Sequence, residues 1–173
     1  MKFALVNDGT LTNETRLVAI GDIQFMIDQL GIHDDLLILT VNNLFEFSLA
    51  EFVDFAKKSY SDALAMYCEA NLDQLKRNGT VDFDENRTVR DFIEKPDIPT
   101  FHHCVPNFYL LKESTLPLIN EYLNEGSNPD APGNFITYLI QYSEVKAIMF
   151  KGKRYDIGTV DSYGNVQQIF SDK

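Results

Sequence analysis

The stretch DDLLILTVNNLFEF, residues 34–47, decides the fold class because it joins an apolar strand to a polar stop. Leu36–Val41 is nearly all apolar, which is typical of a central strand covered by helices on both faces of a sheet. The strand is followed by Asn42 and Asn43. In open α/β sheets, ligands and metals bind at the carboxyl ends of the strands. The two asparagines therefore stand where a metal-binding carboxylate is expected, and an amide supplies no charge.

Strands and helices alternate along the rest of the chain. An apolar run predicts a strand at Phe3–Val6, and apolar residues at helical spacing predict a helix from Leu17 to Leu30, ended by Gly31. Ser48–Glu51 reads as a capping box that begins a helix through Lys58. Further strands are predicted at 63–67, 105–111 and 145–150, a hairpin at 81–95, and helices at 71–77, 114–123, 135–142 and after Thr159. The sequence predicts a single α/β domain over residues 1–173, with a mixed, mainly parallel sheet.

Charge and composition exclude some classes of function. The 173 residues carry a formal net charge of −11, which opposes binding to nucleic acid or to an anionic membrane, since both select for clustered Lys and Arg. The opening MKFALVNDGT is too short for a signal-peptide core, and no apolar run reaches spanning length. The protein is therefore expected in the cytoplasm. Cys68 and Cys104 lack CxxC spacing, so both are expected to be reduced thiols.

Three segments bear chemically useful side chains. In Glu94-Lys95-Pro96 the proline favours an extended Lys95, which would aim its ammonium at a phosphate; the alternative is a solvated lysine. FHHC, residues 101–104, offers two imidazoles and a thiol, but a zinc site needs ligands from a second segment. Asp156 precedes a glycine turn and suits a divalent cation, although an exposed turn residue is the commoner case.

Four motifs, taken in order, resemble a known family. They are DDLLILTVNNLFEFSLAEFVDFAKK, GTVDFDENRTVRDFIEKP, FYLLKESTLPLINEYLNEGSNPDAPGNFI and RYDIGTVDSY. Together they resemble the nucleotide-sugar pyrophosphorylases, most closely the glucose-1-phosphate thymidylyltransferase-like sugar nucleotidyltransferases, from about Phe3 to Tyr163. The resemblance implies a Rossmann-like fold. It also implies a reaction in which a sugar 1-phosphate attacks the α-phosphorus of a nucleoside triphosphate and releases pyrophosphate, with Mg²⁺ as cofactor.

The resemblance assigns substrate-binding roles to five residues. Lys95 matches the lysine that contacts the sugar phosphate, and Glu94 the glutamate that binds a sugar hydroxyl. Gly79 matches a glycine that lets the sugar approach the backbone. Val105 and Asn107 match the strand that lines the sugar pocket, although the family usually has glycine at the position of Asn107, where a side chain would crowd the sugar.

The metal-binding and nucleotide-binding parts depart from the family. Asp156 matches the second metal aspartate, with Arg154 in place of the usual aromatic residue, and the first metal aspartate is replaced by Asn42. Nothing resembling the Gly-rich triphosphate loop precedes Phe3. We therefore expect an N-terminally truncated homologue that is inactive alone. The alternative is a non-catalytic module that binds a sugar phosphate or takes part in assembly. In either case a homo-oligomer or a partner chain would cover the truncated side.

Overall fold

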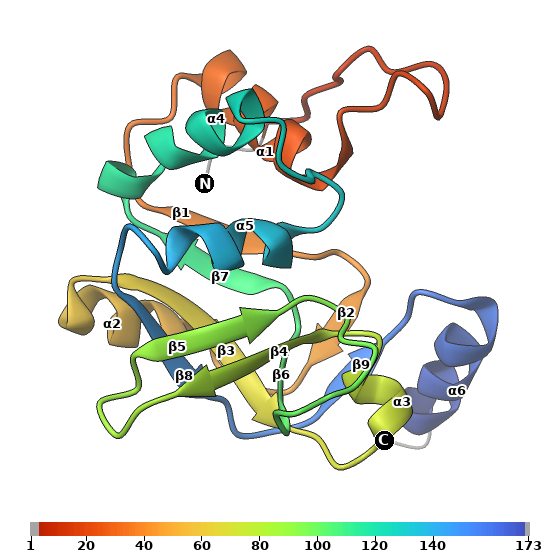
Figure 1. Cartoon of the computed structure of the whole chain (residues 1–173). Coiled ribbons are helices and arrows are strands. Elements are labelled where there is room, and N and C mark those ends of the chain that lie inside the picture. The colour runs from red at the N-terminus through yellow and green to blue at the C-terminus, as the bar shows by residue number, and fades with distance from the viewer. Residues whose placement is uncertain (1–3, 172–173) are drawn as a thin grey trace.

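The computed structural model describes residues 4–171, which form helices around one seven-stranded sheet and a separate two-stranded sheet (Figure 1). The helices are α1 (Val18–Leu30), α2 (Leu49–Ser59), α3 (Leu72–Leu75), α4 (Pro117–Asn124), α5 (Pro132–Leu139) and α6 (Val160–Ser171), with the 3₁₀ turn η1 (Glu113–Thr115). The strands are β1 (Leu36–Leu39), β2 (Asn43–Phe45), β3 (Asp62–Cys68), β4 (Gly79–Phe83), β5 (Val89–Ile93), β6 (His103–Val105), β7 (Phe108–Leu111), β8 (Val145–Met149) and β9 (Arg154–Asp156). The predicted α/β class is confirmed. Of the predicted strand at residues 3–6, Phe3 lies outside the described residues and Ala4–Val6 are irregular.

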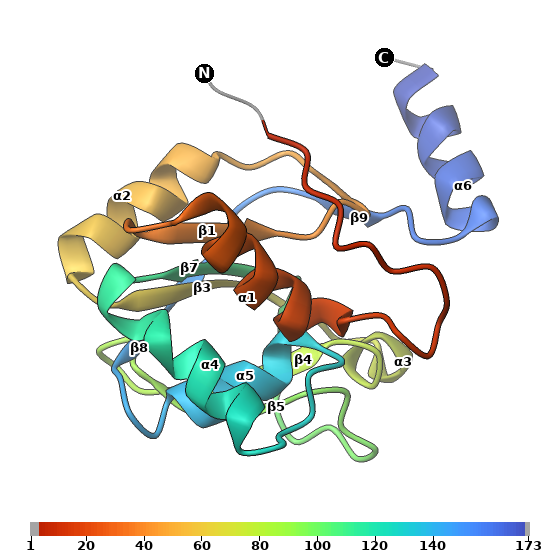
Figure 2. The same ribbon diagram turned by 90° about the horizontal axis from the view of Figure 1, so that it is seen from above.

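The two faces of the large sheet bury different side chains. Strand β3 shows the alternation: Ala63 and Ala65 pack in the apolar cluster on the side of α2, whereas Leu64 and Met66 pack in the cluster that includes residues of α1, α4 and α5. Figure 2 shows α2 on one side of the strands and these three helices on the other. Both clusters are buried, and burial of each large apolar side chain contributes about 1.5–3 kcal/mol to the free energy of folding.

The direction of the strands differs from the prediction. The strand order is β1-β7-β3-β6-β4-β5, and β8 pairs with β3. A mixed sheet is confirmed, but a mainly parallel sheet is wrong, because β3–β8 is the one parallel pair among the described strands. The reason is that β7 returns between β1 and β3, so these two strands point the same way without touching.

The strand from the opening motif lies at an edge. It spans Leu36–Leu39 rather than Leu36–Val41, and Val41 is 97% exposed. Among residues 4–171, β1 pairs with β7 alone, and its four side chains are half-buried. Its side chains pack in both apolar clusters, as predicted for a strand covered on both faces, but no second strand of the described residues meets its other edge.

The strand predicted at 105–111 is divided in two. Pro106 has no backbone N–H to donate, and Asn107 adopts a left-handed φ of 56°, so the chain bends between β6 and β7. Before the bend β6 pairs with β4, and after it β7 pairs with β1. The bend follows Val105, which pairs with Gly79 at the start of β4.

The helix ends follow the sequence in part. Gly31 ends α1 in the left-handed conformation, with φ 57°, as predicted. Thr159 accepts a hydrogen bond from the backbone of Ser162 at 3.1 Å and so caps α6. The predicted capping box at α2 is not formed, because Ser48 holds the N-cap position without a side-chain cap bond.

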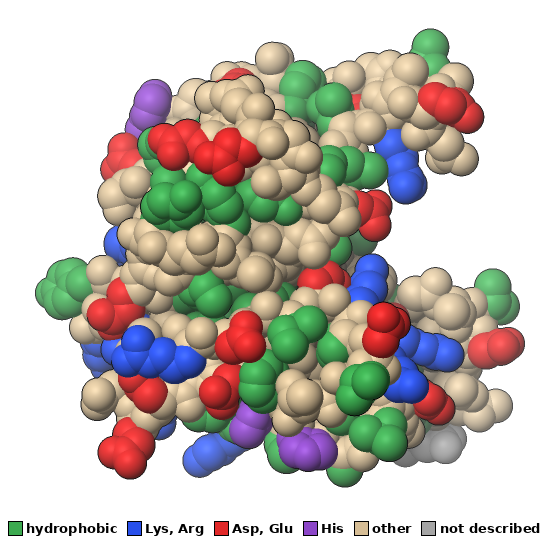
Figure 3. Space-filling view, in the orientation of Figure 1, with side chains coloured by type: hydrophobic (Ala, Val, Ile, Leu, Met, Phe, Trp, Pro, Cys, Tyr) green, Lys and Arg blue, Asp and Glu red, His purple; other side chains and the backbone are tan. Residues whose placement is uncertain are grey.

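Acidic side chains are spread over the face of the molecule seen in Figure 3, in keeping with the net charge of −11. None of the helices between residues 4 and 171 combines the length and the apolar character needed to cross a bilayer.

Candidate functional site

Glu94 and Lys95 directly follow β5, whose last residue, Ile93, pairs with Thr80 of β4. Lys95 has a left-handed φ of 47°, and its N–H donates to the carbonyl of Asn78 at 3.2 Å. The predicted extended Lys95 is therefore wrong: a tertiary hydrogen bond outweighs the preference that Pro96 imposes. Lys95 Nζ lies 3.9 Å from Glu94 Oε1, and the lysine side chain is 55% exposed.

Glu94 is held in an unusual environment for a carboxylate. Its side chain is 9% exposed, and Oε2 has no hydrogen-bond partner among the described residues. Burial raises the pKa of Glu94; the Lys95 ammonium partly offsets this, and the negative charge of Asp130 adds to it. A buried acceptor without a donor costs about 1–3 kcal/mol, so this oxygen is available to a ligand that brings a hydroxyl.

Two glycines make room for the Glu94 carboxylate. A Cβ on Gly79, the first residue of β4, would lie 3.0 Å from Glu94 Oε2 and 2.4 Å from the ring of Phe92. A Cβ on Gly133, in the first turn of α5, would lie 2.0 Å from Glu94 Oε2. The structure thus brings Gly79 and Gly133 to the Glu94 carboxylate. Gly133 is not among the site residues that the sequence indicated; its position just after a proline at a helix start was the available signal.

Val105 and Asn107 border the same region. Val105 is buried and pairs across the ladder with Gly79. The side-chain oxygen of Asn107 accepts a hydrogen bond from the hydroxyl of Tyr109 at 2.9 Å. Burial raises the pKa of Tyr109, and the negative charge of Glu94 raises it further. Tyr109 is therefore hydrogen-bonded to Asn107 and close enough to Glu94 to be affected by its charge, a connection that residue types alone did not reveal.

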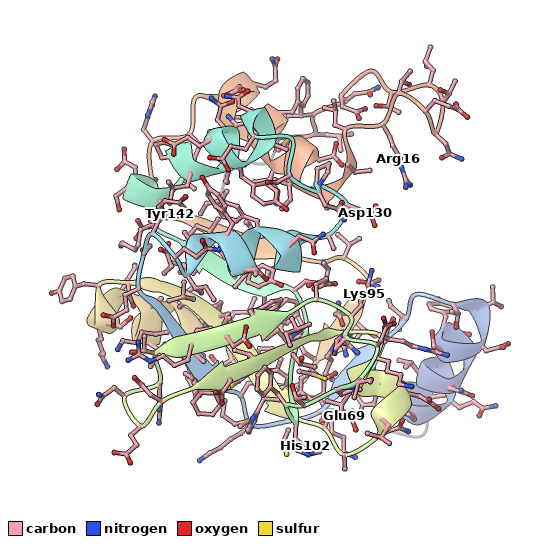
Figure 4. The ribbon with its side chains drawn as sticks, viewed as in Figure 1. Arg16, Glu69, Lys95, His102, Asp130 and Tyr142 are labelled. Carbon is pink, nitrogen blue, oxygen red and sulfur yellow. The ribbon has the colours of Figure 1, made fainter. Side chains whose placement is uncertain are left out.

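Charged side chains surround a notch in the surface near Lys95. In Figure 3 the surface is hollowed between the N-terminal loop and the body below it, and Figure 4 labels Arg16 and Asp130 above this notch and Lys95 below it. Arg16 Nη2 lies 3.8 Å from Asp130 Oδ1, and both side chains are more than half exposed. The notch therefore offers both signs of charge around the buried Glu94.

Asn42 and Asp156 meet in the two-stranded sheet. Asp156 of β9 pairs with Asn43 of β2, and the N–H of Ile157 donates to the carbonyl of Asn42 at 2.9 Å. A Cβ on Gly158 would lie 3.0 Å from Asp156 Oδ1 and 3.3 Å from Asn42 Nδ2, so both side chains border this glycine. The two predicted metal positions are thus together in space.

Arg154 stands beside this pair. Its Nη2 lies 3.6 Å from Asp156 Oδ2, its Nη1 donates to the hydroxyl of Tyr67 at 3.0 Å, and its Nε donates to the side-chain oxygen of Asn43. The arginine side chain is 11% exposed, against 52% for Asp156. Arg154, Asp156 and Tyr67 also line a cavity of about 740 Å³ bordered by α6.

The donor set does not fit a divalent cation. Asp156 is a single carboxylate and already has a cation beside it, whereas Mg²⁺ takes near-octahedral oxygen ligands. Within residues 4–171, no three His, Cys, Asp or Glu side chains come together as a potential metal site. The FHHC segment therefore gains no third ligand there; His103 packs edge-on against Phe83, and Cys104 is buried.

Comparisons with known proteins place the chain in a family. The sequence model of the nucleotidyl transferase family matches residues 17–173. The glucose-1-phosphate adenylyltransferase of Mycoplasma mobile is 26% identical over 73% of this chain and 34% of its own length. That of Clostridium acetobutylicum is 28% identical over 72% of this chain and 34% of its own length. The chain thus spans about a third of the length of these curated relatives.

Solved structures show the same fold. A UDP-glucose pyrophosphorylase complexed with UDP-glucose superposes with a TM-score of 0.76 at 20% identity, over 90% of this chain and 62% of the other. A UTP-bound UGPase from Acinetobacter baumannii superposes with a TM-score of 0.72 at 16% identity, over 89% and 56%. The Rossmann-like sheet is therefore shared with this group of structures.

Proposed function

Because the chain belongs to the nucleotidyl transferase family, we propose that Glu94 and Lys95 form a binding site for a sugar 1-phosphate and that the 173 residues do not transfer a nucleotide by themselves. The observation that supports binding most directly is the buried Glu94 oxygen without a hydrogen-bond partner among the described residues. A binding site tolerates such a group because its ligand supplies the missing donor.

The two side chains suit the two parts of such a ligand. Glu94 Oε2 would accept a hydrogen bond from a sugar hydroxyl, and the missing side chains of Gly79 and Gly133 let the carboxylate lie close to both backbones. The exposed Lys95 ammonium, next to Glu94, would bind the phosphate as a point charge. Val105 forms part of the buried wall behind Gly79.

The absence of nucleotidyl transfer is proposed from the pair Asn42 and Asp156. Phosphoryl and nucleotidyl transfer depend on neutralising phosphate charge with bound cations. Here one of the two expected carboxylates is an amide, and the other already has Arg154 as its counter-ion.

The binding proposal is tested by NMR titration with glucose 1-phosphate, glucose and inorganic phosphate. We expect a millimolar dissociation constant for the sugar phosphate, which corresponds to a binding free energy of about 4 kcal/mol. Lys95→Ala should remove the preference for glucose 1-phosphate over glucose, Glu94→Gln should weaken both, and the exposed Lys76→Ala serves as a matched control. Equal chemical-shift changes in native and Lys95→Ala protein would show that Lys95 is an ordinary solvated lysine with no part in binding.

The activity proposal is tested by pyrophosphate release. With any nucleoside triphosphate, a sugar 1-phosphate and Mg²⁺, we expect no release above a blank without protein. Turnover that is abolished by Asp156→Ala would contradict the proposal.

The second candidate function is an assembly module, and the specific observation behind it is the edge of β1. This strand presents one unpaired edge among the described residues, although its sequence is apolar throughout. The two candidates are separable, because assembly through β1 requires neither Glu94 nor Lys95.

A further inference from the structure

We infer that the Arg154 guanidinium takes the place of a divalent metal ion in the cleft lined by Arg154 and Asp156 of β9, so that Asp156 is paired with a cation of the chain itself. This inference goes beyond sugar-phosphate binding. It depends on family membership and on the geometry of the cleft. It does not depend on whether Glu94 and Lys95 bind a sugar phosphate.

Strand geometry sets the position of the guanidinium. Arg154 and Asp156 are two residues apart on β9, so their side chains lie on the same face of the strand. The register places Asn43 opposite Asp156 and Phe45 opposite Arg154. The arginine therefore lies next to the one carboxylate that the predicted metal site retains.

Arg154 is fixed by groups from different parts of the chain. Its Nε donates to Asn43 of β2, its Nη1 donates to Tyr67 of β3, and its carbon Cζ lies 5.5 Å from the centre of the Tyr67 ring. At 11% exposure the guanidinium is nearly removed from water, and Asp156 is the carboxylate that balances its charge. A residue held in this way is part of the architecture of the cleft.

Both oxygens of Asp156 already face donors. Oδ1 accepts the N–H of Gly158 at 2.8 Å, and Oδ2 faces Arg154 Nη2 at 3.6 Å. A metal ion bound to this carboxylate would lie close to the guanidinium and be repelled by it.

Asn42 offers no compensating ligand. Its side-chain oxygen accepts a hydrogen bond from Asn43 Nδ2 at 3.0 Å, while its own Nδ2 borders Gly158 beside Asp156. The amide side of Asn42 thus borders the same glycine as Asp156 Oδ1 and brings no negative charge. With a neutral Asn42 and Arg154 as counter-ion, Asp156 is part of an ion pair within the chain.

The test is Mn²⁺ titration followed by paramagnetic broadening of backbone amide signals. In the native chain we expect no broadening at residues 156–158 beyond that of an Asp156→Asn variant. The double variant Asn42→Asp with Arg154→Phe should broaden there selectively, at a Mn²⁺ concentration at least tenfold lower, and EDTA should reverse the effect. Arg90→Phe is the matched control, because it releases another carboxylate, Asp84, from its arginine outside the cleft.

Two outcomes would overturn the inference. One is selective broadening in the native chain that Asp156→Asn removes; this readout needs no destabilising variant. The other is a double variant that keeps a dispersed amide spectrum and gains no Mn²⁺ binding. If the double variant does not fold, the single variants Arg154→Lys and Asn42→Asp are measured instead. Each keeps a positively charged side chain at position 154, so the Mn²⁺ response should equal that of the native chain. A tenfold gain in Mn²⁺ affinity in either variant would also refute the inference.

Discussion

Single residues in the Glu94 region adopt conformations that cost stability. Lys95 and Asn107 both have a positive φ, at 47° and 56°, which is uncommon for residues other than glycine. Glu94 is buried with an oxygen that no described donor reaches. Such local costs accumulate where a protein binds something, because the ligand or the surrounding structure compensates for them.

Glu94→Gln should stabilise the protein at neutral pH, because burial penalises the charged carboxylate and raises its pKa, whereas the amide carries no charge. Since the folded pKa of Glu94 is raised, the folded state binds the proton more tightly, and native stability falls as pH rises from the usual glutamate range through the raised value. The variant should lack this fall. Urea unfolding at pH 4 to 8 measures it, with the exposed Glu125→Gln as control. An unchanged pH profile in Glu94→Gln would contradict the prediction.

Substitutions at Asn107 should follow backbone conformation. Asn107→Gly should be nearly neutral, because glycine adopts a positive φ freely, although the hydrogen bond to Tyr109 is lost. Asn107→Val should lower the free energy of unfolding by about 2 kcal/mol, since a β-branched residue resists this conformation. Thermal unfolding compares the two variants. If valine is tolerated as well as glycine, the bend between β6 and β7 does not depend on a left-handed residue.

At the scale of elements, Asp62 joins the start of β3 to two other segments. Its carboxylate accepts hydrogen bonds from the Lys112 N–H, the Thr115 hydroxyl and the Ser143 hydroxyl, each at 2.7 Å. The residue is fully buried, and these three donors come from η1 with its preceding residue and from the segment between α5 and β8. One carboxylate thus positions β3, on which both apolar clusters are built.

Asp62→Ala should lower the free energy of unfolding by about 3 kcal/mol, because it leaves buried donors without an acceptor. Asp62→Asn should cost less, since one oxygen remains for Lys112 and Thr115. Urea denaturation of both variants, beside the exposed Asp73→Ala, gives the comparison. An alanine variant as stable as the asparagine variant would show that these bonds add little to stability.

At the scale of the whole molecule, strand β1 and helix α6 are only partly covered by the rest of the described chain. The apolar strand β1 pairs on one side only among the described residues. Helix α6 stands beside the body in Figures 1 and 2, with Val166 as its one buried residue among those described. Apolar edges of this kind favour pairing with another chain.

We therefore expect the 173-residue chain to self-associate, or to require a second polypeptide, through the β1 side. Light scattering at micromolar concentration should give a mass above the 19.8 kDa of one chain, increasing with concentration. A monodisperse mass near 19.8 kDa together with cooperative thermal unfolding would contradict this expectation.

The sequence by itself determined the local elements and the chemistry of the side chains. Apolar spacing located α1, and Gly31 ended it, because helix periodicity and a left-handed cap depend on residues close together in the chain. The order of motifs indicated that Asn42 and Asp156 would meet, and residue identity alone showed that one of the two is neutral. In the structure, Asn43, the neighbour of Asn42, pairs with Asp156 across two strands that the sequence did not predict.

Tertiary structure decided what depends on residues distant in the chain. The return of β7 between β1 and β3 made the sheet mainly antiparallel, and a hydrogen bond to Asn78 turned Lys95 away from the extended form. The guanidinium of Arg154 was placed by Asn43, 111 residues away, and by Tyr67, 87 residues away. A local pattern cannot specify such contacts, because the free energy of each one is gained only after the intervening chain has folded and brought the two groups together.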